Sequence, residues 1–398
     1  MEKWKLFKLG DLVSIKGGKR LPKGINLIKI ANQHPYIRIR DLGKSKYLEL
    51  DSSYEYVDDE TYKSISRYIV NQGDIVLAIV GNTIGLVGVV GKSLHLANLT
   101  ENCVKFVELN SINRDFLYYF LLSEIGQMEI QKGIVGAAQP KLPIKNISNI
   151  TILLPPLEEQ KQIARILSAL DDKIELNRRI NENLEQQAQA FFKHWFVENV
   201  SDEWLRGIAS DFYNITIGKT PPRKEQQWFT TNKQDVAWVS IADMGNSNVY
   251  IDESSEYLTC DAVDKFNIVV VPDNTVILSF KLTIGRIAIT NGQMTTNEAI
   301  AHFKTRNDEL VEYTYLYLKN YNFASLGSTS SIATAINSKI VKSMPWIMPD
   351  EKTLRSFHLI VKPLFNVIKK NINENKRLVE LRDTLLPKLM NGEITITE

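Results

Sequence analysis

The sequence predicts an α/β (α+β) protein that is an internal repeat: two similar mixed α/β domains separated by a pair of long antiparallel coiled-coil-like helices, with pseudo-two-fold symmetry. Three observations predict it. The same strand-forming segments occur twice, each copy ends in a strand stopped by proline, and a long helical pattern follows each proline. At 398 residues the chain is long enough for two or three domains.

The repeat has a period of roughly half the chain. The tripeptide Thr83-Ile84-Gly85 recurs 200 residues later as Thr283-Ile284-Gly285, and a run of apolar residues follows both. Residues 37–43 are echoed by 238–245, and the alternation of β-branched residues in both copies predicts paired strands. Residues 150–155 match 344–349 at an offset of 194, so each copy is expected to end in a strand before proline.

After each proline, apolar residues recur with a spacing of three and four, which predicts a long helix with one apolar seam. The first seam consists of Ile163, Leu167, Leu170, Ile174, Asn177, Asn181, Leu184, Ala188, Phe191 and Trp195. Shifting by 194 gives the second, Phe357, Val361, Leu364, Ile368, Asn371, Asn375, Leu378, Arg382, Leu385 and Leu389. A helix over 157–195 would be roughly 60 Å long, and the other copy's helix, packed antiparallel, is the simplest cover for its seam.

Both seams carry two asparagines, Asn177 and Asn181 in the first and Asn371 and Asn375 in the second. Polar residues inside an apolar seam lower stability but exclude slipped alignments, so these four are predicted to fix the register of the helix pair. In the alternative, each helix packs on its own domain and its asparagines are solvated. For the aromatic residues at 191, 192, 195 and 196, core packing is favoured over a partner surface, because Phe191 and Trp195 occupy seam positions.

Composition predicts a cytoplasmic protein with no membrane segment. No stretch approaches the ~20 apolar residues of a membrane span, and residues 1–11 lack an export signal. The two cysteines, Cys103 and Cys260, are too few for a disulfide framework and fit a reducing compartment. The net charge of +2 neither supports nor excludes DNA binding, because phosphate affinity depends on where Lys and Arg are placed.

No catalytic or metal-binding motif is complete. Residues 154–157 contain two prolines but lack the amide or acid and the aromatic residue of an adenine-methyltransferase loop. The triplet 91–93 ends like a P-loop, but Leu86 stands where its first glycine is required. Pro272-Asp273 and Lys281 resemble a nuclease site, but Ser279 replaces its acid. The five histidines are scattered, so no metal site and no catalytic residue are predicted.

The run LPPLEEQKQIARIL at 154–167 closely resembles the start of the central spacer helix in specificity subunits of Type I restriction-modification systems. Residues 385–394 resemble the C-terminal signature of that family, and 190–196 its counterpart after the first helix. The resemblance implies a target recognition domain at 1–153, a central spacer helix at 154–200, a second target recognition domain at 201–348, and a C-terminal spacer helix and tail at 349–398. The second spacer, which starts at Pro349, lacks the Glu-Glu-Gln run of the first.

In this family each recognition domain reads one half of a bipartite double-stranded DNA target, and the spacer length sets the gap. The resemblance therefore implies a non-catalytic DNA-binding subunit that recruits two methyltransferase (M) subunits and restriction (R) subunits, in defence against foreign DNA. The assembled complex would be an adenine-N6 methyltransferase and ATP-dependent endonuclease. S-adenosylmethionine, ATP and magnesium would be bound by the partners, with no cofactor in this chain.

Three alternatives remain open: a coiled-coil adaptor without DNA readout, the recognition subunit of a methyltransferase-only or Type IIB-like system, and an enzyme with an unrecognised site. Direct readout requires polar side chains that reach base edges from loops or strands. The candidate DNA contacts, some of them to phosphates alone, are Lys19, Arg20, Arg38 and Arg40 in the first copy and Lys219, Thr220, Arg223, Lys224, Lys281 and Arg286 in the second.

Overall fold

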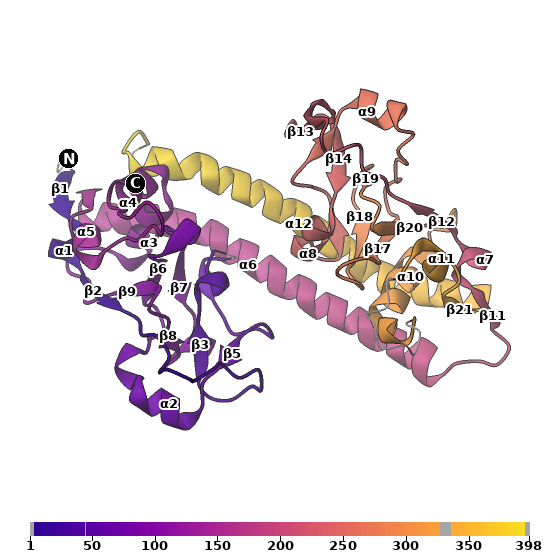
Figure 1. Ribbon diagram of the computed structural model, residues 1–398, viewed down its shortest axis with the longest axis horizontal. Helices are drawn as coiled ribbons and strands as arrows, with labels where there is room; N and C mark the ends of the chain where they lie inside the picture. The colour runs from indigo at the N-terminus through magenta and orange to yellow at the C-terminus, as the bar shows by residue number, and fades with distance from the viewer. Residues whose placement is uncertain (1–3, 44, 327–335, 395–398) are drawn as a thin grey trace. The chain divides into compact units, whose positions relative to one another are not determined.

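The computed structural model describes residues 4–43, 45–326 and 336–394 (Figure 1). The chain forms two compact units, unit 1 from residues 1–176 and 375–398 and unit 2 from residues 177–374. Each of the two long helices therefore contributes one part to each unit. Residues 1–3, 44, 327–335 and 395–398 of the predicted domains lie outside the described residues.

Unit 1 contains ten strands among its described residues: β1 (Lys5–Lys8), β2 (Ser14–Gly17), β3 (Pro35–Ile37), β4 (Tyr47–Leu48), β5 (Glu55–Tyr56), β6 (Ile75–Ala78), β7 (Val87–Val90), β8 (Asn98–Leu99), β9 (Cys103–Val107) and β10 (Thr151–Leu154). Its short helices are α1 (Leu9–Leu12), α2 (Asp59–Ser64), α3 (Arg114–Leu122), α4 (Glu124–Lys132) and α5 (Ile144–Ser148). The main sheet has the order β2-β9-β6-β7-β4, and β4 pairs with β7 in parallel. A second sheet has the order β5-β3-β8, and β1 pairs with β10.

Unit 2 contains the strands β11 (Leu205–Ile208), β12 (Asn214–Ile217), β13 (Phe229–Thr230), β14 (Val236–Val239), β15 (Tyr250–Ile251), β16 (Tyr257–Leu258), β17 (Val276–Ser279), β18 (Ile287–Thr290), β19 (Thr295–Thr296), β20 (Ile300–Lys304) and β21 (Pro345–Met348). Its short helices are α7 (Ala209–Phe212), α8 (Ile241–Asn246), α9 (Cys260–Lys265), α10 (Leu310–Asn320) and α11 (Ser338–Lys342). The sheets have the orders β12-β20-β17-β18-β15, β13-β16-β14-β19 and β11-β21.

The two units repeat one topology. In both main sheets the two central antiparallel strands, β6 with β7 and β17 with β18, are buried along their whole length. A short parallel strand flanks β7 in unit 1 and β18 in unit 2. Strand β18 begins 200 residues after β7, and β21 begins 194 residues after β10, which are the two offsets found in the sequence. The predicted internal repeat of mixed α/β domains is therefore confirmed.

The strands predicted over 37–43 and 238–245 are wrong beyond their first residues. Strand β3 ends at Ile37 and β14 ends at Val239, and a 3₁₀ turn (Ile39–Asp41) and α8 follow them. In both copies an aspartate caps the turn, because the backbone N–H of Arg38 donates to Asp41 and that of Ser240 donates to Asp243. These local hydrogen bonds compete with strand pairing.

The long helices are α6 (Leu157–Lys193), which continues as a π-helical segment at His194–Glu198, and α12 (Glu351–Met390). In unit 1, Arg382 of α12 contacts Asp171 of α6 at 2.8 Å. In unit 2, the Asn371 amide donates to Asn181 Oδ1 at 2.8 Å, and the Asn177 amide donates to Glu374 at the same distance. Within each unit the residue numbers rise along one helix as they fall along the other, so the helices pack antiparallel there.

One seam position is wrong. Phe191 is 38% exposed, whereas Phe192 and Phe196 are buried in the core of unit 2. The Phe196 ring lies 4.8 Å from that of Phe357 on α12. At 3.6 residues per turn an α-helix drifts relative to a strict 3-4 alternation, so the buried face continues from Ala188 in steps of four.

Across the described ranges, no helix is long and apolar enough to cross a membrane.

Candidate nucleic-acid interface

The loop after β2 is held against the turn before β9 by its backbone. The N–H of Gly18 donates to the carbonyl of Cys103 at 3.0 Å, and that of Lys19 donates to the carbonyl of Leu99 at 2.8 Å. A Cβ at Gly18 would lie 2.0 Å from the carbonyl oxygen of Thr100, so only glycine fits here. This close contact fixes where the loop presents its basic side chains.

The loop after β12 is held in the same way in unit 2. The N–H of Gly218 donates to the carbonyl of Ile300 at 3.1 Å, and that of Lys219 donates to the carbonyl of Thr296 at 2.9 Å. A Cβ at Gly218 would lie 2.1 Å from the Thr296 hydroxyl oxygen. The two loops are structural equivalents, one in each unit.

A carboxylate lies beside the loop in unit 1. Arg20, whose side chain is 80% exposed, donates from Nε to Glu101 Oε1 at 2.7 Å. Burial raises the pKa of Glu101, but the hydrogen bonds from Arg20, from the backbone and from Thr100, together with the charge of Arg20, outweigh it and lower the pKa overall. Arg20 and Glu101 line a hollow of about 360 Å³, together with the polar side chains of Asn102, Gln139 and Lys141. The hollow offers donors and acceptors together, as base edges require.

Glu298 occupies the corresponding position in unit 2, before β20, and accepts a hydrogen bond from the Thr220 hydroxyl. Burial raises its pKa, but that hydrogen bond and the nearby charges of Lys281 and Arg223 outweigh it and lower the pKa overall. The structure thus brings three of the predicted residues together around one carboxylate. Lys224, next in the chain to Arg223, is exposed.

Arg223 and Lys219 also contact their own unit. Arg223 forms a bidentate pair with Glu256, at 2.8 and 2.9 Å, and its guanidinium lies 4.4 Å from the Trp238 ring centroid. The Lys219 ammonium donates to the carbonyl of Phe266 at 2.6 Å. A guanidinium that binds a carboxylate through two parallel hydrogen bonds can bind a phosphate in the same geometry, so Arg223 is able to exchange Glu256 for a phosphate.

Three predicted residues brace their own domains. The Arg38 guanidinium, only 14% exposed, bonds Asp41 and Glu55, and Arg40, which is more exposed, also bonds Glu55 at 3.1 Å. Arg286 is half-buried and donates to the carbonyl of Ile241. The structure does not bring these arginines to Glu101 or Glu298.

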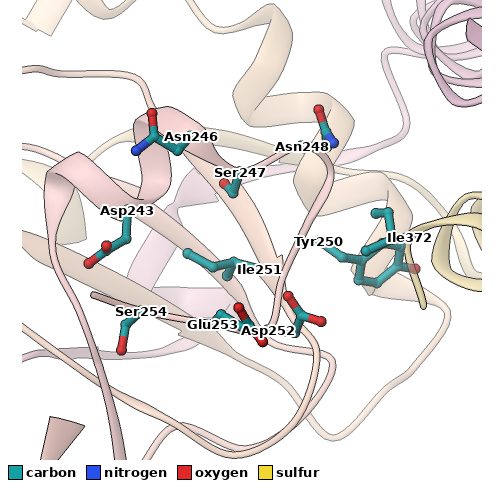
Figure 2. A pocket seen from close by; sticks show the side chains of 10 residues that line it. All are labelled: Asp243, Asn246, Ser247, Asn248, Tyr250, Ile251, Asp252, Glu253, Ser254 and Ile372. Atoms are coloured by element: carbon teal, nitrogen blue, oxygen red, sulfur yellow. The ribbon is translucent and has the colours of Figure 1, made fainter. Parts of the chain in front are cut away.

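A second hollow, of about 340 Å³, lies in unit 2 beside α12 (Figure 2). Figure 2 shows Asp243, Asp252 and Glu253 around it, with Ile372 of α12 at one side. Asp243 serves the fold, because it accepts from the backbone N–H groups of Ser240 and Ser255. The carboxylates that line the hollow repel DNA phosphates, so the hollow is not a DNA-binding candidate. Among the residues described, no group of three or more His, Cys, Asp or Glu could hold a metal ion.

The family model "Type I restriction modification DNA specificity domain" matches the chain twice, over residues 1–186 and 202–383. The chain belongs to this family. Each match covers one copy of the repeat together with most of the helix that follows it. The resemblance drawn from residues 154–167 is thereby confirmed.

Two specificity subunits are similar to this chain over almost its whole length. The Type I restriction enzyme HindI specificity subunit of Haemophilus influenzae is 24% identical over 99% of this chain and 100% of its own length. The MjaIX specificity subunit of Methanocaldococcus jannaschii is 23% identical over 99% and 94%. The crystal structure of the Type I system S subunit from M. genitalium has the same fold, with a TM-score of 0.54 and 16% identity over 99% of this chain and 97% of that one.

Glu101 and Glu298 are absent from the DNA contacts predicted from the sequence, because that prediction favoured side chains that donate hydrogen bonds. A signal was available, since each carboxylate directly precedes a strand of the repeat, at an offset of 197. Carboxylates also read DNA, because they accept a hydrogen bond from the cytosine amino group.

Proposed function

We propose that this chain is the DNA-reading subunit of a Type I restriction-modification complex, with the loops around Gly18 and Gly218 each facing one half of a bipartite target. The observation that carries the proposal is their equivalence: both loops are fixed by the same backbone contacts beside a carboxylate, in a chain that matches a DNA specificity family twice. Two equivalent reading sites in one chain suit a target made of two separate halves.

The proposed DNA contacts at and beside these loops are the half-buried Thr220 and the exposed side chains of Lys19, Arg20, Lys219, Arg223, Lys224 and Lys281. To bind a phosphate or a base, Arg20 gives up its ion pair with Glu101. Because the Arg20 side chain is exposed, losing this ion pair costs little free energy. We assign to Arg38, Arg40 and Arg286 the support of the reading surface, because each bonds its own domain.

The paired helices act in this proposal as a spacer between the two reading domains. Asn181 and Asn371 are buried and hydrogen-bonded to each other, and the amide of Asn375 donates to the carbonyl of Ile174 at 3.2 Å. A shift by one turn would leave these buried amides without partners, so they set the register. Deletion of one heptad within 163–195 should change the gap between half-sites or abolish assembly.

In this proposal the chain is not an enzyme. Two methyltransferase subunits bind S-adenosylmethionine and modify adenine, and restriction subunits use ATP and magnesium. Support comes from the curated relatives, which are named as specificity subunits of restriction enzymes. A complex that acts on chromosomal and incoming DNA works in the cytoplasm.

The test is a genome-wide map of methylated adenines in cells that express the cognate methyltransferase subunit with and without this chain. We expect methylation at one bipartite motif only when the chain is present. Replacing residues 1–153 by the same domain of another subunit should change one half of the motif and leave the other intact. A chain that assembles with the methyltransferase but directs it to no motif would be an adaptor, and the proposal would fail.

A further inference from the structure

The loop between β17 and β18 carries the most exposed large apolar side chain of the described residues. Leu282 is 96% exposed, and Ile284, two residues on, is 39% exposed. Most exposed apolar residues need no explanation when they lie alone on a regular strand or helix. Leu282 differs because it combines almost complete exposure with an unfavourable backbone conformation; Leu96, which also has a positive φ, is 42% exposed.

Leu282 has a φ of +58°, in the left-handed region that a side chain with a Cβ disfavours. Unit 1 shows that the turn has no need of leucine. The equivalent loop of unit 1, between β6 and β7, is one residue longer and turns at Gly81–Thr83, where Gly81 has a φ of +76° and no leucine is present. Glycine makes this conformation without strain, so the fold itself does not require an exposed leucine at residue 282.

The loop is short and firmly held at its base. The N–H groups of Ser279 and Gly285 bond the carbonyls of Arg286 and Ser279, at 2.9 and 3.0 Å. The Ser279 hydroxyl donates to the carbonyl of Thr283 at 2.6 Å. Phe280, two residues before Leu282, is buried and anchors the start of the loop. Leu282 is therefore presented at a fixed position.

The surroundings of Leu282 indicate what it contacts. Lys281 precedes it and lies near Glu298, in the cluster that also contains Thr220 and Arg223. A protein partner generally buries about 800 Å² on each side of a stable interface, far more than the tip formed by Leu282 and Ile284 offers. A small apolar tip beside cations matches DNA, where the thymine methyl group lies in the major groove between two phosphate backbones.

We infer that Leu282 is a specificity-determining residue, which contacts the 5-methyl group of a thymine in the half-site read by unit 2. The inference rests on the proposed function. It assigns to the second reading domain an apolar contact that the first domain, with Gly81–Thr83 at the turn of its equivalent loop, does not make.

The test uses the full chain assembled with its methyltransferase subunits and synthetic duplexes that carry the mapped target. Each thymine of the half-site read by unit 2 is replaced in turn by uracil, which lacks only the methyl group. We expect the wild-type complex to lose about fourfold in affinity at one position, the factor for burying one methyl group. Leu282→Gly should bind the thymine and uracil duplexes equally, and Leu205→Ala, which alters a 66% exposed leucine on β11, should behave as wild type.

Leu282→Gly is suited to the test because glycine adopts the positive φ of residue 282 without strain, and its folding is checked by its thermal unfolding. A wild-type complex that binds no bipartite target contradicts the proposed function itself. If the wild type reads its target but no uracil duplex binds more weakly, or if Leu282→Gly keeps the difference, the inference is wrong. If the variant loses methyltransferase binding while its discrimination is unchanged, Leu282 is a protein contact and the inference is equally wrong.

Discussion

Replacing the buried asparagine pair by leucine separates stability from register in the helix pair. Asn181 is 6% exposed and Asn371 is 8% exposed, and the amide of Asn371 donates to Oδ1 of Asn181 at 2.8 Å. In Asn181→Leu the buried amide of Asn371 loses its acceptor, which should cost about 1–3 kcal/mol. In the double variant both polar groups are gone, so the free energy of unfolding should return to the wild-type value or exceed it.

The assay is urea unfolding followed by tryptophan fluorescence, which reports on unit 2. Five of the six tryptophans belong to this unit, namely Trp195, Trp204, Trp228, Trp238 and Trp346. The control is Asn183→Leu on the same helix, where the side chain is exposed and the cost should be within about 0.5 kcal/mol. A single variant no costlier than this control, or a double variant as weak as the sum of the two singles, would refute the reasoning.

The same double variant tests the spacer in a methylation map. Without the asparagines the apolar seam tolerates slipped alignments, so we expect methylation at targets with more than one gap length, or loss of assembly. A stable double variant that still methylates one motif with one gap would show that other contacts set the register.

The remaining predictions concern a buried ion pair, a histidine and a loop. Asp171→Ala leaves the buried Tyr119 hydroxyl without its acceptor, while Arg382 keeps its contact with Asp383, and should destabilise unit 1 by about 1–3 kcal/mol in thermal unfolding, part of which returns when Arg382→Met is added. Burial lowers the pKa of His302 to about 3 from 6.5, so the unfolded chain binds the proton first and the stability of unit 2 should fall as pH drops below about 6.5; His302→Gln should remove that part of the pH dependence. Gly18→Ala should prevent the loop from docking and abolish DNA binding, whereas Gly17→Ala, whose added Cβ lies 3.8 Å from its nearest neighbour, should fold and bind normally.

The repeat and the long helices could be predicted because they are written in periodicity. Apolar spacing reports the buried face of a helix directly, and ten of ten positions of the second seam, from Phe357 to Leu389, are buried or half-buried. The wrong predictions concern strand ends, where local hydrogen bonds determine the structure, and the end of α6, where the helix has rotated away from the 3-4 pattern. Asp41 and Asp243 end the predicted strands by capping a turn, and Phe191 turns outward where the helix phase has moved on.

The candidate site was predictable in part. Repeat position alone identified the equivalent loops that contain Lys19 and Lys219, because a gap of 200 residues links them. It could not show that Arg38 bonds Asp41 and Glu55, since the folded turn brings Asp41 to it and the pairing of β5 with β3 brings Glu55. The positive φ of Leu282 is also hidden from the sequence, because leucine disfavours this conformation and only the folded loop imposes it.

Unit 1 consists of two stretches of chain with all of unit 2 between them, and this affects the order of synthesis. Ile163 and Leu167 of α6 share a core with Leu386 and Leu389 of α12. At roughly 5–20 residues per second, a ribosome needs about 10 to 40 s to pass from residue 177 to residue 375. During that interval unit 2 can fold, while the nascent first unit waits with an uncovered apolar face, which is a binding surface for chaperones.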